Sequence, residues 1–87
     1  MTTKNTNKKV RPLSEIAREI KKSWGEKMYF GAKPYVSAML SLGSIKDDYM
    51  FDKAADIVRY FLSNACSWRG EDARRIKKEL NEMLKDA

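Results

Sequence analysis

Apolar residues recur every three or four positions along most of this chain, which is the period of an α-helix that is buried on one side. No stretch shows the sustained alternation of apolar and polar residues that is typical of a half-buried strand. The pattern predicts an all-α chain that folds as a compact bundle of about four helices. Proline and glycine mark the ends of the first two helices, which begin at Pro12 and Pro34 and end at Gly25 and Gly43.

The third predicted helix begins at Asp48 or Asp52, because either carboxylate is a suitable N-terminal cap. Its apolar face is the broadest in the chain, so we expect it to be the central helix, with neighbours on more than one side. That face consists of Phe51, Ala54, Ala55, Ile57, Val58, Tyr60, Phe61, Leu62 and Ala65. A turn at residues 67–70 leads to a fourth helix that covers the third. Its apolar positions are Ala73, Ile76, Leu80 and Met83.

A chain of 87 residues has room for a single core, so residues 12–87 are predicted to form one helical domain. The net charge of +6 is concentrated in residues 1–11, which contain four cations and no acid. These residues are predicted to be a flexible basic tail, because they lack the apolar side chains that would offset the entropy lost on ordering. The tail cations are candidate phosphate contacts, the alternative being a terminus that only adds solubility. They are Lys4, Lys8, Lys9 and Arg11.

The composition also narrows the chemistry. The chain has no histidine, which excludes imidazole metal sites and histidine-activated nucleophiles. It has one cysteine, Cys66, which is too few for an internal disulfide or a structural zinc site. The acidic series Asp48, Asp52 and Asp56 lacks the order and the glycine of a calcium loop. We therefore expect no enzyme activity, no cofactor and no metal. No apolar run is long enough to span a membrane, so a cytoplasmic protein is predicted.

The fourth predicted helix carries Arg74 and Lys78, which are further candidate phosphate contacts. The alternative is a solvated face that is stabilised by ion pairs four residues apart. The expected pairs are Glu71 with Arg75, Arg75 with Glu79, and Lys78 with Glu82. The apolar positions of the same helix also resemble a short coiled-coil seam, which leaves a homodimer open.

Aromatic residues gather in the connector at residues 25–33 and near the turn at 67–70. The candidates for binding a protein or a nucleic acid are Tyr29, Tyr35, Trp68 and Arg69, together with the two helix cations named above. Tyrosine, tryptophan and arginine are over-represented at binding hot spots, because each buries a large area and keeps a polar group. The alternative is that these rings close the ends of the bundle.

Two stretches resemble a group of small uncharacterised proteins that are carried by phages, plasmids and integrative elements of Gram-positive bacteria. They are YFGAKPYVSAM (Tyr29–Met39) and VRYFLSNACSWRGE (Val58–Glu71). The resemblance implies no catalytic residue. It implies a mobile-element setting, in which small non-enzymatic proteins tend either to bind DNA or to block host defence, as anti-CRISPR proteins do. Our hypothesis is a non-catalytic protein that inhibits a nucleic-acid-processing defence protein of the bacterial host. The alternative is a small basic accessory or regulatory protein that binds DNA or RNA directly.

Overall fold

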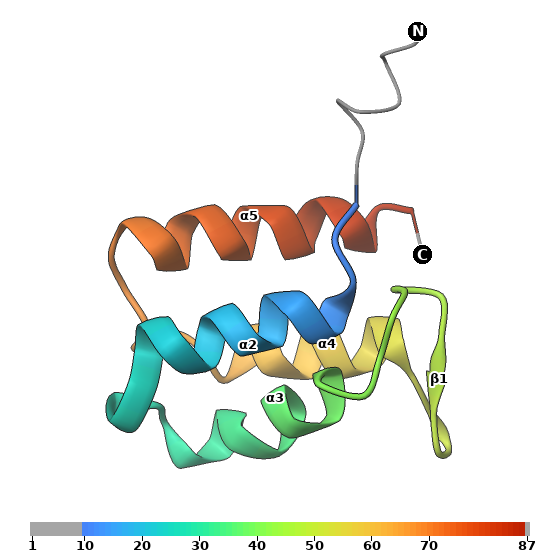
Figure 1. Cartoon of the computed structure of the whole chain (residues 1–87), viewed down its shortest axis with the longest axis horizontal. Coiled ribbons are helices and arrows are strands. Elements are labelled where there is room, and N and C mark those ends of the chain that lie inside the picture. The colour runs from blue at the N-terminus through green and yellow to red at the C-terminus, as the bar shows by residue number, and fades with distance from the viewer. Residues whose placement is uncertain (1–9, 87) are drawn as a thin grey trace, which may run out of the picture.

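The computed structural model describes residues 10–86, which contain four α-helices and one short β-hairpin (Figure 1). The helices are α2 (Leu13–Trp24), α3 (Lys33–Met39), α4 (Ala54–Ser63) and α5 (Glu71–Leu84). Two 3-10 helices, η1 (Gly25–Lys27) and η2 (Phe30–Ala32), connect α2 to α3, and the strands β1 (Asp48–Tyr49) and β2 (Asp52–Lys53) precede α4. The prediction of a compact, mostly helical fold is confirmed.

The predicted tail cations Lys4, Lys8 and Lys9 lie outside the described residues. Between residues 10 and 86, no helix has both the length and the apolar character needed to cross a membrane.

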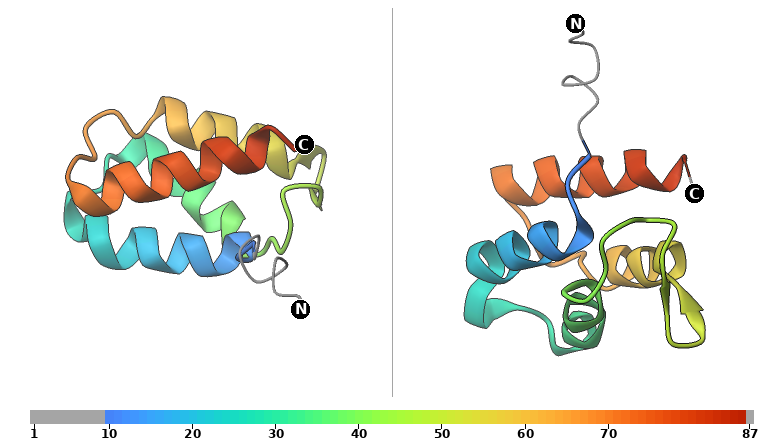
Figure 2. Two further views of the ribbon diagram at one scale, coloured as in Figure 1. Left: turned by 90° about the horizontal axis from the view of Figure 1, so that it is seen from above. Right: turned by 45° about the vertical axis from the view of Figure 1, so that its right-hand side comes forward.

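The helices surround one core. Both α3 and α5 pack against α2 and α4, and Figure 2 shows the same arrangement from two other directions. The core contains fully buried side chains of both α2 and α4: Ile16, Ile20, Val58 and Phe61. Because α2 and α4 have the same helical neighbours, α4 is not the single central helix that the sequence predicts.

The start of α2 is fixed by the segment that follows α3. The helix begins directly after Pro12, as predicted, but no side chain caps it. Instead the amide of Leu13 donates to the carbonyl of Gly43 at 3.1 Å, and the amide of Ser14 donates to the carbonyl of Leu42 at 2.9 Å. These bonds satisfy N–H groups that the first turn of a helix leaves without partners.

Residues 48–53, predicted as the beginning of the third helix, form the hairpin instead. The helix starts only at Ala54 and has no side-chain cap, so the prediction that Asp48 or Asp52 caps it is wrong. Phe51, which the sequence assigns to the core, lies in the hairpin turn and is fully exposed. The acidic series expected on one helix face is thereby divided between the hairpin and α4.

Asp47 holds the base of the hairpin. Its Oδ2 accepts hydrogen bonds from the amides of Gly43 and Ser44 at 3.0 and 2.9 Å, and its carbonyl accepts one from the amide of Ala54 at 2.8 Å. These bonds turn the chain before α4, and the hairpin extends away from the helices (Figure 1).

The apolar face predicted for α5 is confirmed. Its residues are buried against the neighbouring helices: Ala73, Ile76, Leu80 and Met83. Because this face is used inside the chain, it is not available as a coiled-coil seam for a second copy.

Three aromatic rings close one end of the core. Trp24, the last residue of α2, stacks on Trp68 with ring centroids 5.4 Å apart and an interplanar angle of 13°. Phe61 meets both rings edge-on, each at 6.3 Å. Lys77 Nζ donates a hydrogen bond to the carbonyl of Trp68 at 2.7 Å. The Trp68 side chain is only 4% exposed, so it belongs to the core and not to the surface where the sequence predicts a binding residue.

We expect Trp68→Ala to lower the free energy of unfolding by about 3–5 kcal/mol, because it leaves a cavity beside Trp24 and Phe61. The adjacent exposed residue provides a control, since Arg69→Ala should change the free energy of unfolding by less than about 0.5 kcal/mol. Urea unfolding followed by circular dichroism measures both. Equal stability of the two variants would contradict the core position of Trp68.

Candidate binding surface

Four aromatic side chains line the seam between η2, α3 and α4, and we call them the aromatic face: Tyr29, Phe30, Tyr35 and Tyr60. The rings of Tyr29 and Phe30 have centroids 5.0 Å apart, and those of Tyr35 and Tyr60 are 5.6 Å apart. Phe30 is 76% exposed, Tyr60 48% and Tyr29 45%, whereas Tyr35 is partly buried. The face therefore offers much aromatic surface to a partner.

Asn64 connects the two pairs of rings. It lies one turn after Tyr60 along α4, and its Nδ2 donates a hydrogen bond to the Tyr60 carbonyl at 2.8 Å. It also lines a surface cavity with Tyr29 at the end of α4. This cavity has a volume of about 220 Å³ and is lined by Tyr29, Ser63, Asn64, Cys66 and Ser67. Asn64 thus lies beside both Tyr29 and the backbone of Tyr60.

Gly31 sets the position of the Tyr29 ring. A Cβ atom at Gly31 would lie 2.5 Å from Cε2 of Tyr29 and 3.0 Å from Oδ1 of Asn64. The ring approaches the backbone at a position where only glycine leaves enough space.

The sequence predicts Tyr29 and Tyr35 as binding residues, and both lie on the aromatic face. It assigns Tyr60 to the core, but that side chain is about half exposed. A signal for its exposure is present in the sequence, because Asp56, Ser63 and Asn64 are polar and lie three or four residues from it, on the same side of the helix. Arg69 is exposed, and no hydrogen bond or ion pair within the described part of the chain links its side chain to the aromatic face.

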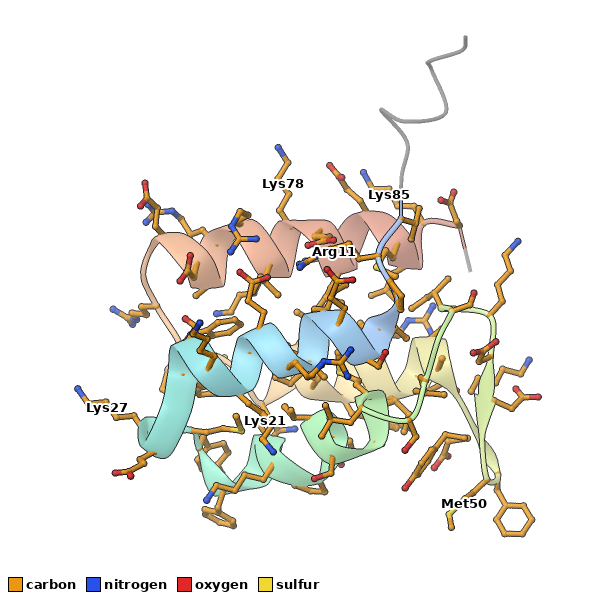
Figure 3. All side chains as sticks on the ribbon, in the orientation of Figure 1. Arg11, Lys21, Lys27, Met50, Lys78 and Lys85 are labelled. Carbon is orange, nitrogen blue, oxygen red and sulfur yellow. The ribbon has the colours of Figure 1, made fainter. Side chains whose placement is uncertain are left out.

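A second exposed feature is the cation row of α5, which consists of Arg74, Lys78 and Lys85. Arg74 and Lys78 are one turn apart, and Lys85 follows two turns later on the same side. Figure 3 shows Lys78 and Lys85 directed away from the other helices. None of the three forms an ion pair with another residue between 10 and 86.

The ion pairs that the sequence predicts within α5 do not form among the described residues. Arg75 pairs with Asp72 at 3.2 Å and with Glu19 of α2, and Glu79 accepts hydrogen bonds from Arg11. Arg75 is thus paired with Glu19 of α2 and with Asp72, and Glu79 is paired with Arg11. These contacts replace the predicted pairs between residues four positions apart.

Arg11 lies between α2 and α5 (Figure 3) and does not belong to a free tail. Its guanidinium donates to both carboxylate oxygens of Glu79, at 2.7 and 3.0 Å, and to Oε1 of Glu19 at 2.8 Å. The hydrogen bond to Glu79 is the main cause of a raised Arg11 pKa. Because the guanidinium is already occupied by carboxylates, the prediction of Arg11 as a phosphate contact is wrong.

Glu19 accepts hydrogen bonds from cations on two sides. The bond from Arg75 and then the bond from Arg11 lower the pKa of Glu19 below its ordinary value of 4.5. The Arg75 pKa is raised, chiefly by its bond to Glu19. Arg11, Glu19, Arg75 and Glu79 thus form one ion network that ties α2 to α5.

Comparisons of this chain with models of protein families, with curated proteins and with solved structures found no match. The resemblance to small proteins of mobile elements therefore stays a prediction, and so does a bacterial cytoplasmic location.

We expect Glu19→Gln to lower the free energy of unfolding at neutral pH by about 1–2 kcal/mol, because it removes a charged acceptor from two guanidinium groups. The folded-state pKa of Glu19 is depressed, so this stabilisation is complete above the ordinary pKa of 4.5 and is lost as the pH falls through the folded value. The difference from the wild type should therefore shrink in acid.

Urea unfolding at neutral pH and at about pH 3 measures this difference. Glu15→Gln is the matched control, since Glu15 is more exposed and its nearest oxygen is 3.8 Å from Arg11. A difference between the wild type and Glu19→Gln that does not change with pH would rule out the assigned role of the carboxylate.

Proposed function

We propose that this chain is a non-catalytic binding protein and that its aromatic face contacts a partner protein. The observation that carries the proposal is the exposure of Tyr29, Phe30 and Tyr60, which belong to two aromatic pairs in η2, α3 and α4 and the residue before η2. Exposed aromatic side chains that gather in one place are typical of protein interfaces, where they bury much area for a small loss of side-chain freedom.

The partner we propose is a nucleic-acid-processing defence protein of a bacterial host, which the chain inhibits by covering its nucleic-acid site. This part of the proposal rests on the resemblance to small proteins of mobile elements. The aromatic face supports it only as far as a protein contact, because its rings offer stacking and apolar area and its carbonyl and hydroxyl groups offer hydrogen bonds.

Capture from a nuclease-treated lysate of a Gram-positive bacterium tests the proposal. We expect the immobilised full chain to retain one defence protein in a constant ratio, and the purified protein to lose its nucleic-acid-processing activity at equimolar chain. Phe30→Ala should weaken this binding by about tenfold or more, because it removes the most exposed ring of the face. Gly31→Ala should weaken it as well, because the added Cβ displaces the Tyr29 ring.

Phe51→Ala is the matched control, since it removes an even more exposed phenylalanine ring from the hairpin and should leave binding unchanged. Thermal unfolding of each variant confirms that it is folded. Wild-type affinity in both Phe30→Ala and Gly31→Ala would show that the aromatic face is not the interface. Retention of the partner only when nucleic acid is left intact would favour direct binding of nucleic acid.

The cation row of α5 favours that second candidate function. Arg74, Lys78 and Lys85 are exposed and share one side of α5 by helical spacing, with the exposed Glu82 between the last two, and Figure 3 shows Lys78 and Lys85 directed outward. The basic residues 1–9 precede the described part of the chain at Val10. A row of cations of this kind can follow a phosphate backbone without reading its sequence.

If this candidate holds, the association constant for a short DNA duplex should fall steeply with salt concentration. Replacing the three cations of the row by alanine should reduce the slope of log K against log salt by up to about 3, since each phosphate contact contributes about 0.9. Fluorescence anisotropy measures the slope. The matched control replaces Lys21, Lys22 and Lys27 by alanine, which changes the net charge equally. Equal slopes for the two triple variants, or no binding by the wild type, would contradict a nucleic-acid role for the row.

A further inference from the structure

The end of the hairpin is apolar and lies in solvent. Met50 and Phe51 occupy the two turn positions between β1 and β2, where Met50 is 83% exposed and Phe51 is fully exposed. Met50 has a φ of 55°, a conformation for which two-residue hairpin turns normally use asparagine or glycine. Large apolar side chains contribute nothing to the fold here, which indicates that they contact another molecule.

Two carboxylates flank this tip. In the backbone register of the hairpin, Asp48 lies opposite Lys53, and Asp52 lies opposite Tyr49. In the part of the chain that the structure describes, neither carboxylate forms an ion pair, whereas Asp47 at the base is held by backbone amides. Lys53 is an exposed cation opposite Asp48, so Asp48, Asp52 and Lys53 together leave one net negative charge behind the apolar tip.

An apolar groove with positive charge at its edge lies between the end of α2 and the start of α3. Its volume of about 380 Å³ is within the range of pockets that bind small molecules, roughly 300–1,000 Å³, and leaves room for a large side chain. Its lining residues are Lys21, Gly25, Glu26, Met28, Lys33, Val36 and Ser37. Met28 and Val36 are buried and give the groove an apolar floor. Lys21 and Lys33 are exposed, form no ion pair among residues 10–86, and outnumber the single acid.

The tip and the groove match in polarity and in charge, but they cannot meet within one chain. Figure 3 places Met50 at one end of the molecule, Lys27 at the opposite side and Lys21 between them. Asp47 holds the base of the hairpin, which extends away from the helices (Figure 1). A second copy of the chain has no such restriction.

We propose that the hairpin tip of one copy inserts into the groove of a second copy, with Phe51 and Met50 on the apolar floor and Asp48 and Asp52 near Lys21 and Lys33. The two surfaces differ, so each contact leaves one free tip and one free groove. Such a head-to-tail contact forms open chains of molecules. The contact is small, and the association is accordingly weak and concentration-dependent.

Sedimentation of the full chain at increasing concentration, up to about 1 mM, tests this proposal. The wild type should gain mass with concentration and lose the gain in high salt, because the pairs between lysine and aspartate are screened. Two variants should remain monomeric. Phe51→Ser has an inactive tip, and the double variant Lys21→Glu with Lys33→Glu has an inactive groove. Circular dichroism confirms that both are folded.

The decisive sample is an equimolar mixture of the two variants. The intact tip of the groove variant fits the intact groove of the tip variant, so the mixture should form a dimer and nothing larger. Phe30→Ala, which alters only the aromatic face, should associate like the wild type. The proposal is overturned by a monomeric wild type at about 1 mM, by unchanged association of Phe51→Ser, or by a mixture that forms no dimer. None of these outcomes affects the proposed function, which uses the aromatic face of the monomer.

Discussion

The stack of Trp24 on Trp68, with Phe61 against both rings, is the contact on which the rest of the structure depends. It joins the end of α2 to the last turns of α4 and the loop before α5, which follow much later in the sequence. Phe61 directly follows Tyr60 along α4. The buried cluster therefore fixes the turn of α4 that also carries the exposed aromatic face, and a rigid core positions a surface that would otherwise be a loop and a helix end.

The ion network between α2 and α5 is the second constraint, and it acts at the edge of the core. Arg11 and Arg75 share Glu19, and Arg11 also binds Glu79 in a bidentate manner, which fixes the rotation of α5 relative to α2. With Glu79 and its apolar face turned inward, α5 leaves Arg74, Lys78 and Lys85 outside, together with the exposed Glu71 and Glu82. The outward cation row is thus a consequence of how the inner charges are paired.

Periodicity and helix-end signals predict the helices well, because local conformation decides them. Gly25 and Gly70 adopt φ values of 63° and 113°, which suit glycine, and both lie at helix ends. The hairpin could not be predicted in this way. Phe51 has the spacing of a helical core residue. The hydrogen bonds of Asp47, which turn the chain before α4 begins, form only in the folded chain. Trp68 was ambiguous for a related reason, because tryptophan suits both hot spots and cores, and only its contact with Trp24 decides between them.

Folding accounts for the buried residues of this chain but not for its exposed apolar ones. A folded domain is typically stable by about 5–15 kcal/mol, and a small one has little apolar burial in reserve. A non-glycine residue with positive φ costs on the order of 1–3 kcal/mol, so Met50 reduces a limited stability while its side chain stays in solvent. Phe30 is likewise left outside a core that already buries three aromatic rings. Local choices that oppose stability are expected where a sequence serves binding, and here they occur at two separate places, the aromatic face and the hairpin tip.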